Sequence, residues 1–159
     1  LKAEIEQLVG EINGQFTRSG WVPIHYIYQR IDFTTLLAYY RASEIALITP
    51  LKDGMNLVAK EYCACSLEDG VLILSEFAGA ATQLHRDALL VNPYDVEGVA
   101  AAIYRAWKMS REERRNRMRN MRRIIRERDI FWWVDSFLEA GSAPSLSSFT
   151  QIEEFVPIY

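Results

Sequence analysis

Short apolar runs that alternate with helical patterns constrain the fold of this 159-residue chain more than any other feature. The last three runs are continuous rather than alternating in polarity, which is typical of parallel strands buried on both faces. Helical patterns between them favour strand–helix–strand units with right-handed crossovers. We therefore predict an α/β fold with a parallel sheet. The predicted strands are residues 22–28 (VPIHYIY), 45–49 (IALIT), 71–75 (VLILS) and 88–91 (ALLV).

Helices are expected between these strands and after the last one. Asp95 is placed to cap a helix that runs to about Lys108, and Ser110 and Glu113 have the spacing of a capping box at the start of the next. The predicted helices are 32–42, 56–65, 78–84, 95–108, 110–128 and the aromatic 129–138 (DIFWWVDSFL). Residues 1–140 are interpreted as a single domain. Residues 141–159, which begin rich in Ser and Pro and show no clear period, are interpreted as a tail or linker.

Charge is distributed unevenly, because 11 of the 18 Lys and Arg residues lie between Tyr104 and Arg128 while the formal net charge is −3. This basic segment invites a nucleic-acid interpretation. However, in its main run, residues 111–128, methionines and isoleucines recur at helical spacing, and this run has no aromatic residue on which bases could stack. A solvated amphipathic helix is the favoured interpretation, with no nucleic-acid partner.

Compartment and membrane signals point to a cytoplasmic protein. No apolar run approaches the roughly 20 residues of a membrane helix, and no signal core follows a basic start. Cys63 and Cys65 lie about 200° apart around a predicted helix, so they cannot easily pair. We expect both to be buried and reduced, and two thiols without suitably spaced partners are too few for a zinc site. No membrane partner is expected.

A candidate ligand site follows the second predicted strand, where the loop 51–55 leads into a helix that starts near Asn56. In open parallel sheets, ligands bind beyond the carboxyl ends of the strands, and a helix N-terminus offers unpaired N–H groups to phosphates. The amides around Asn56, Leu57 and Val58 suit a diphosphate, and Gly54 permits close approach of a ligand.

Two carboxylates accompany this helix start. Glu61 lies four residues after Leu57 on the same helical face, where it could accept hydrogen bonds from the two hydroxyls of a ribose. Asp53, just before the helix, could bind sugar hydroxyls in the same way. These residues suggest a sugar nucleotide lying across the helix N-terminus. An ordinary Asp-Gly turn and a solvated glutamate account for the same residues without a ligand.

The amino-acid sequence of this region resembles that of the C-terminal domain of trehalose-6-phosphate synthases, which are retaining glycosyltransferases of the GT-B fold. The resemblance runs from about Leu8 to Leu138. It is carried by "TPLKDGMNLVAKEY", "GVLILSEFAGAATQL" and "ALLVNPYD", together with "INGQF", "WVPIHYIYQ" and "LLAYYRASEIALITP". It implies a Rossmann-like half of a GT-B C-terminal domain, followed by C-terminal helices, so residues 1–140 would be a partial nucleotide-sugar-binding domain.

The resemblance also implies roles for individual residues. Asp53 would bind glucose hydroxyls at the catalytic centre, as a sugar ligand rather than a covalent nucleophile. The glucose would be held largely by backbone groups of the next three residues, the diphosphate by the amides of Leu57 and Val58, and the ribose by Glu61. The loop at Arg30 and Ile31 would meet the base. The full implied donor site is Arg30, Ile31, Leu36, Asp53, Gly54, Met55, Asn56, Leu57, Val58 and Glu61.

The implied reaction is transfer of glucose from UDP-glucose, or another nucleoside diphosphate glucose, to glucose 6-phosphate with retention, without a metal or other cofactor. Uridine, guanosine and adenosine remain alternatives for the donor base. A glucosylglycerol-phosphate synthase, a non-catalytic sugar-nucleotide-binding or regulatory module and, from the basic helix, an RNA-binding protein are the alternative functions.

Two parts of the family pattern cannot be found in this sequence. These are a basic Arg and Lys pair for the donor diphosphate and an N-terminal domain that binds the sugar-phosphate acceptor. We therefore expect a fragment of a longer enzyme that is inactive alone. It is also expected to self-associate as a homo-oligomer through the surface that the missing half would cover.

Overall fold

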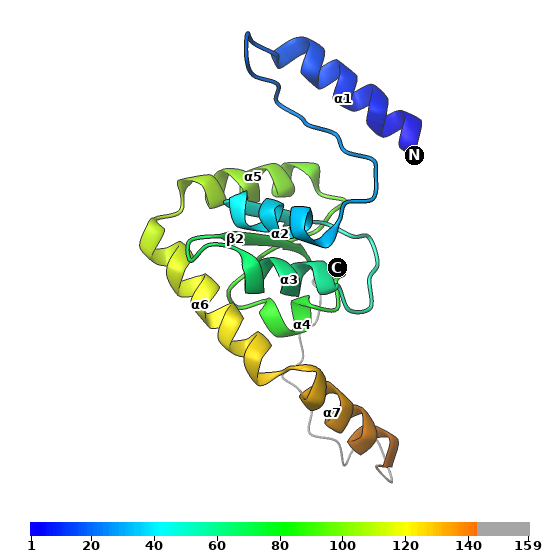
Figure 1. The fold of residues 1–159 in the computed structure, drawn as a ribbon, viewed down its shortest axis with the longest axis vertical. Helices are drawn as coiled ribbons and strands as arrows, with labels where there is room; N and C mark the ends of the chain where they lie inside the picture. The colour runs from blue at the N-terminus through cyan, green and yellow to red at the C-terminus, as the bar shows by residue number, and fades with distance from the viewer. Residues whose placement is uncertain (143–159) are drawn as a thin grey trace. The chain divides into compact units, whose positions relative to one another are not determined.

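The computed structural model describes residues 1–142, so the predicted tail from residue 143 onward lies outside the described residues (Figure 1). The chain divides into two compact units, Leu1–Phe33 and a second that begins at Thr34. None of the helices in the described part is long and apolar enough to cross a membrane.

The first unit contains α1 (Lys2–Phe16) and an irregular segment. The predicted strand at 22–28 is wrong, because these residues form no strand. A strand needs a neighbour for its backbone N–H and C=O groups. Here the amide and the carbonyl of Ile24 are instead bonded, both at 3.0 Å, to the side chain of Asn13. Only a single bridge, between Arg18 and Trp21, pairs backbone in this segment.

The second unit is built on a parallel three-stranded sheet of β1 (Ile45–Ile48), β2 (Val71–Ser75) and β3 (Leu89–Val91), in the order β1-β2-β3. Ile45 pairs with Val71, and Ile73 pairs with Leu89. The three continuous apolar runs of the sequence are thus strands of one sheet, as predicted.

Within residues 34–142 and at their boundary with the first unit, six helices surround or follow the sheet. They are α2 (Phe33–Ala42), α3 (Leu57–Cys65), α4 (Ala81–Leu84), α5 (Val96–Lys108), α6 (Arg111–Glu127) and α7 (Ile130–Ser142). The two predicted caps are confirmed, since Asp95 accepts a hydrogen bond from the Gly98 amide at 2.9 Å and Ser110 accepts one from the Glu113 amide at 3.2 Å. Helix α4 starts three residues later than predicted, because residues 78–80 form a turn.

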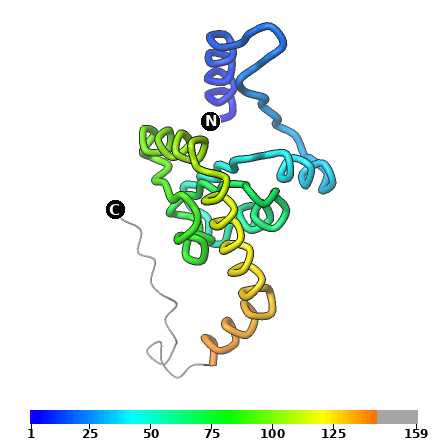
Figure 2. The backbone as a smooth tube through the Cα atoms, turned by 90° about the vertical axis from the view of Figure 1, so that its left-hand side faces the viewer, coloured from blue at the N-terminus to red at the C-terminus, as the bar shows by residue number. Residues whose placement is uncertain are grey.

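The central strand β2 is buried along its whole length, with both of its faces covered. Leu72 and Leu74 point into a core shared with α3, α4 and α6. Val71 and Ile73 point into a second core against α5. Figure 1 shows β2 between α5 on one side and α3 and α4 on the other. Figure 2, turned by 90°, shows α6 (yellow) alongside the sheet and these helices. This double burial explains why the strand is apolar at every position but its last.

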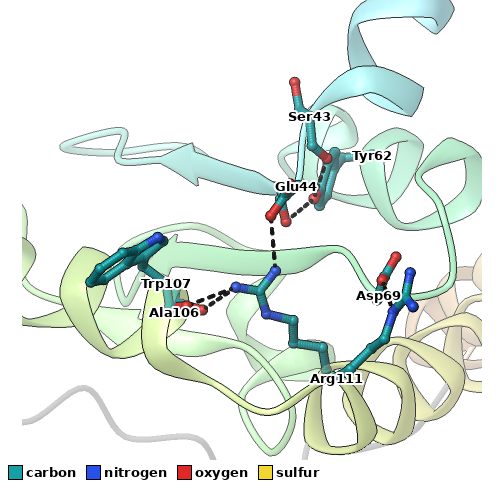
Figure 3. A network of polar contacts seen from close by, with 8 residues as sticks. Ser43, Glu44, Tyr62, Asp69, Ala106, Trp107 and Arg111 are labelled. Carbon is teal, nitrogen blue, oxygen red and sulfur yellow. Dashed lines mark hydrogen bonds and ion pairs between the residues drawn. The ribbon is translucent and has the colours of Figure 1, made fainter.

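Arg114 of α6 closes the C-terminal end of α5. One terminal nitrogen of its guanidinium donates to the carbonyls of Ala106 and Trp107 at 2.9 and 3.1 Å, and the other lies 3.2 Å from the carboxylate of Glu44. These three partners are labelled in Figure 3. The last carbonyls of a helix have no partner within the helix, so this contact satisfies two of them. It also joins both helices to the residue just before β1.

Tyr62 of α3 also contacts the segment just before β1. Its hydroxyl lies 3.2 Å from the carbonyls of Ser43 and of Glu44, to which it donates (Figure 3). Burial raises the pKa of Tyr62 to about 12, so the hydroxyl stays protonated as a donor. The neighbouring Cys63 is buried and free, and burial raises its pKa to about 12 as well. Cys65 is also free, but it is only half-buried.

The two-sided burial of β2 gives a stability prediction. Leu72→Ala removes a fully buried side chain, and we expect it to lower the free energy of unfolding by about 2–5 kcal/mol in urea titrations. Leu47→Ala on β1 is the matched control, because that leucine is 46% exposed. The control should cost less than about 1 kcal/mol. Equal losses in the two variants would contradict the described packing.

Candidate functional site

The candidate site lies where β1 and β2 end, because parallel strands bring their carboxyl ends to one edge of the sheet. The loop after β1 and the loop after β2 are joined there by backbone hydrogen bonds. The Gly79 amide donates to the carbonyl of Asp53 at 2.8 Å, and the Asp53 amide lies 3.4 Å from the carbonyl of Phe77. The loop that was predicted to hold a ligand is therefore supported by the neighbouring strand's loop.

Glycine at position 79 is required for this support. A Cβ atom at Gly79 would lie 2.1 Å from the carbonyl oxygen of Gly54 and 2.6 Å from its carbonyl carbon. A Cβ atom at Gly54, in contrast, would meet no atom within 4 Å. The two loops are therefore packed backbone against backbone on one side, while the side of the loop at Gly54 is open.

Asp53 organises the loop from within. One of its carboxylate oxygens accepts hydrogen bonds from the amides of Met55 and Asn56 at 3.0 and 2.9 Å, and the other accepts one from the Asn56 side chain at 2.9 Å. These hydrogen bonds hold the pKa of Asp53 below its ordinary value, and the bond from the Met55 amide contributes most. The carboxylate is thus ionised at neutral pH and serves as the centre around which the loop turns.

Asn56 links the loop to helix α3. Its backbone is left-handed, with φ 63° and ψ 78°, a conformation that asparagine tolerates better than most residues. Its side-chain oxygen accepts a hydrogen bond from the Ala59 amide at 2.9 Å, which makes it the N-cap. The amides of Leu57 and Val58 make no hydrogen bond to the described part of the chain. These two donors at the positive end of a helix form an anion-binding position.

Glu61 lies one helical turn after these donors and is held by a residue of α2. The hydroxyl of Tyr40 donates to a carboxylate oxygen of Glu61 at 3.2 Å. The pKa of Tyr40 is raised to about 12, mainly by burial and next by this hydrogen bond. The hydroxyl therefore remains a donor across the physiological pH range. The Tyr40 ring also packs edge-on against Tyr62, with the ring centres 6.3 Å apart. The orientation of the Glu61 carboxylate is therefore determined by the packing between α2 and α3.

The structure brings most of the predicted donor-site residues into one short region. The loop and the first turns of α3 hold Asp53, Gly54, Met55, Asn56, Leu57, Val58 and Glu61. Leu36 lies on α2, four residues before Tyr40 and so on the same helical face. Arg30 and Ile31 belong to the first compact unit, so their place beside the base stays a prediction.

Two residues of the site were missed in the sequence. One is Tyr40, because nothing in the sequence relates it to Glu61, 21 residues away. Gly79 belongs to a small-residue run, AGAA, which shows that the chain is closely packed there without saying against what. Only the three-dimensional arrangement identifies Gly54 as its neighbour.

A hollow of about 290 Å³ adjoins the loop. Gly54, Met55 and Gly79 line one part of it, and Trp132 and Trp133 of α7 line another. Trp133 is 43% exposed. No group of three or more His, Cys, Asp or Glu residues that could hold a metal ion occurs in residues 1–142.

Comparisons with known proteins agree with this geometry. The sequence model of glycosyltransferase family 20 matches residues 1–142. The trehalose-6-phosphate synthase of Mycobacterium leprae (strain TN) is 49% identical over 147 residues, which are 91% of this chain and 29% of that protein. The chain thus spans less than a third of the length of the relatives it matches, and the resemblance found in the sequence is confirmed.

Solved structures match the fold as well. A structure from E. coli bound with UDP-2-fluoro glucose superposes with a TM-score of 0.81 and 45% identity, over 87% of this chain and 31% of that one. An alpha,alpha-trehalose-phosphate synthase (UDP-forming) from Burkholderia xenovorans in complex with glucose-6-phosphate gives a TM-score of 0.83 and 42% identity, over 89% and 31%. The predicted fold class, a parallel-sheet half of a GT-B domain, is confirmed by these matches.

The contact between the two glycines gives a prediction about the loop. Gly79→Ala forces backbone to move, and we expect it to lower the free energy of unfolding by about 1–3 kcal/mol. Gly54→Ala adds the same methyl group in open space and should change that energy by less than about 0.5 kcal/mol. Urea titrations of both variants test this. A Gly79→Ala protein as stable as Gly54→Ala would show that the two loops are not in contact.

Proposed function

Because the chain belongs to glycosyltransferase family 20, we propose that it supplies the nucleotide-sugar side of an enzyme that transfers glucose from UDP-glucose to glucose 6-phosphate. The product is trehalose 6-phosphate, formed with retention at the donor carbon. One observation supports this most directly: a loop ordered by Asp53 presents the unpaired amides of Leu57 and Val58, with the carboxylate of Glu61 one turn further along α3.

In this proposal the donor diphosphate lies at the N-terminus of α3. The amides of Leu57 and Val58 donate to its oxygens, and the helix dipole adds partial positive charge. Negative charge grows on the diphosphate as the bond to glucose breaks, so donors held in place before the reaction stabilise the transition state more than the bound substrate.

The ribose is assigned to Glu61. A carboxylate that accepts hydrogen bonds from two neighbouring hydroxyls must be held in a fixed orientation, and Tyr40 supplies that restraint through one of the two oxygens. Tyr40 is thus a positioning residue, since its hydroxyl acts on the ligand through Glu61.

The glucose is assigned to the open side of the loop at Gly54. Met55 and Asn56 already donate their amides to Asp53, so they shape the loop rather than bind the sugar through those amides. Asp53 accepts three hydrogen bonds within the loop, and a carboxylate has about four acceptor positions. One position therefore remains for a sugar hydroxyl, which makes Asp53 first a loop-forming residue and second a sugar ligand.

The acceptor is assigned to parts of such an enzyme beyond this chain. The chain covers only 31% of the Burkholderia xenovorans synthase whose structure contains glucose-6-phosphate. We also place the enzyme in the cytoplasm, which the two free cysteines support.

Nucleotide binding tests the donor assignment directly. We expect UDP and UDP-glucose to bind the chain weakly in calorimetry. Glu61→Ala should weaken UDP binding by roughly 10- to 150-fold, the value of a hydrogen bond to a charged group. Tyr40→Phe should weaken it by no more than about fivefold, because it removes only the restraint on Glu61.

Two controls make that result specific. Glu97→Ala removes an exposed carboxylate from α5 and should leave UDP binding unchanged. A UDP analogue without ribose hydroxyls should bind wild type and Glu61→Ala equally. If Glu61→Ala instead weakens both ligands to the same extent, the ribose does not lie at Glu61.

A chimera tests whether this half supports turnover. Residues 1–142 replace the matching segment of the Burkholderia xenovorans synthase, and UDP release from UDP-glucose is measured with glucose 6-phosphate as acceptor. We expect an active chimera whose kcat/KM falls by at least about tenfold with Glu61→Ala, since ribose contacts are lost. A chimera that folds and binds glucose 6-phosphate but releases no UDP would contradict the proposed function.

A further inference from the structure

A second concave site lies on helix α6, and the donor site does not involve it. The hollow has a volume of about 350 Å³. Its lining consists of one carboxylate residue and five arginines: Glu68, Arg115, Arg119, Arg122, Arg123 and Arg126. None of these is among the residues assigned to the nucleotide sugar.

Helical spacing explains why the arginines converge. Arg115, Arg119, Arg122 and Arg126 follow one another at intervals of four, three and four residues, so they lie along one face of α6. Met118 and Met121 are fully buried in the core, which fixes the rotation of the helix about its axis. The arginine face is therefore an obligatory consequence of how α6 packs.

Arg122 is held in place at the floor of the hollow. Its Nε donates to the carbonyl of Cys63 at 2.8 Å, and one terminal nitrogen donates to the carbonyl of Ser66 and lies 3.3 Å from that of Leu67. These carbonyls at the end of α3 are neutral groups with only partial negative charge. They orient the guanidinium of Arg122 while leaving most of its charge uncompensated.

The other arginines are poorly compensated too. Arg115 lies 3.8 Å from Glu68, whose side chain is 78% exposed, and Arg123 lies 3.4 Å from Glu127. Arg119 and Arg126 make no hydrogen bond or ion pair with residues 1–142. Like charges four residues apart destabilise a helix, and this face contains several such pairs. An anion in the hollow would relieve that repulsion.

We propose that this hollow binds a small anion that carries two or more phosphoryl groups. Guanidinium groups donate in pairs to phosphoryl oxygens, and several converging arginines match several such groups. A single-stranded nucleic acid is less well matched, because its bases stack on aromatic side chains and the lining contains none. Since α6 also packs on α3, the helix that begins at the donor loop, an occupied hollow stabilises the fold beneath that loop.

Inorganic tripolyphosphate is the probe for the test. We expect calorimetry on the full 159-residue chain to show binding that weakens as NaCl is added, and the thermal midpoint to rise above that in NaCl of equal ionic strength. Arg119→Gln with Arg126→Gln should weaken the affinity at least about tenfold, because two charge-assisted contacts are lost. Arg119→Lys with Arg126→Lys keeps the charge and should weaken it less.

The matched control is Arg41→Gln with Arg105→Gln, which removes two exposed charges from α2 and α5. An equal loss in this control would assign the binding to net charge and overturn the proposal. Absence of binding or thermal stabilisation in wild type would overturn it as well. A single-stranded oligonucleotide that binds far more tightly than tripolyphosphate, with affinity rising with its length, would make the face a nucleic-acid surface instead.

Discussion

Burial of β2 on both faces is the constraint on which the rest of the second unit depends. Because Leu72 and Leu74 face one core and Val71 and Ile73 face the other, helices must cover both sides of the sheet. Because the strands are parallel, each connection between them must cross over the sheet. The carboxyl ends of β1 and β2, and the loops that follow them, therefore lie at one edge. The loop 51–55 lies at that edge, and the position of the candidate site is thus a consequence of packing.

Within the loop, stability and binding depend on the same atoms. Asp53 uses its carboxylate to turn the chain, and Asn56 uses its side chain to start α3, so the amides left without a partner among residues 1–142 are those of Leu57 and Val58. If a diphosphate binds there as proposed, the site needs little rearrangement, because its donors are already oriented. The close contact of Gly79 with Gly54 restrains the backbone of the loop.

Much of this could be predicted from the sequence, for identifiable reasons. The continuous runs that became β1, β2 and β3 are short and apolar, and the caps at Asp95 and Ser110 are local signals. The segment 22–28 is also short and rich in apolar and β-branched residues, yet it forms no strand, because strand formation depends on a neighbouring backbone that composition does not reveal. Tyr40 and Gly79 escaped prediction for a related reason, since their roles depend on residues distant in sequence.

The two proposed anion sites differ in positive charge, and this difference has a consequence for the proposed reaction. The amides at the start of α3 contribute roughly half a positive charge, whereas a diphosphate leaving group carries more than one negative charge. Lys60, which lines the hollow beside the loop, is the nearest cationic side chain on α3, and burial lowers its pKa. The arginines of α6 serve a separate hollow. A complete donor site therefore requires further cations, which agrees with the absence from this sequence of the basic Arg and Lys pair that the family resemblance implies for the diphosphate.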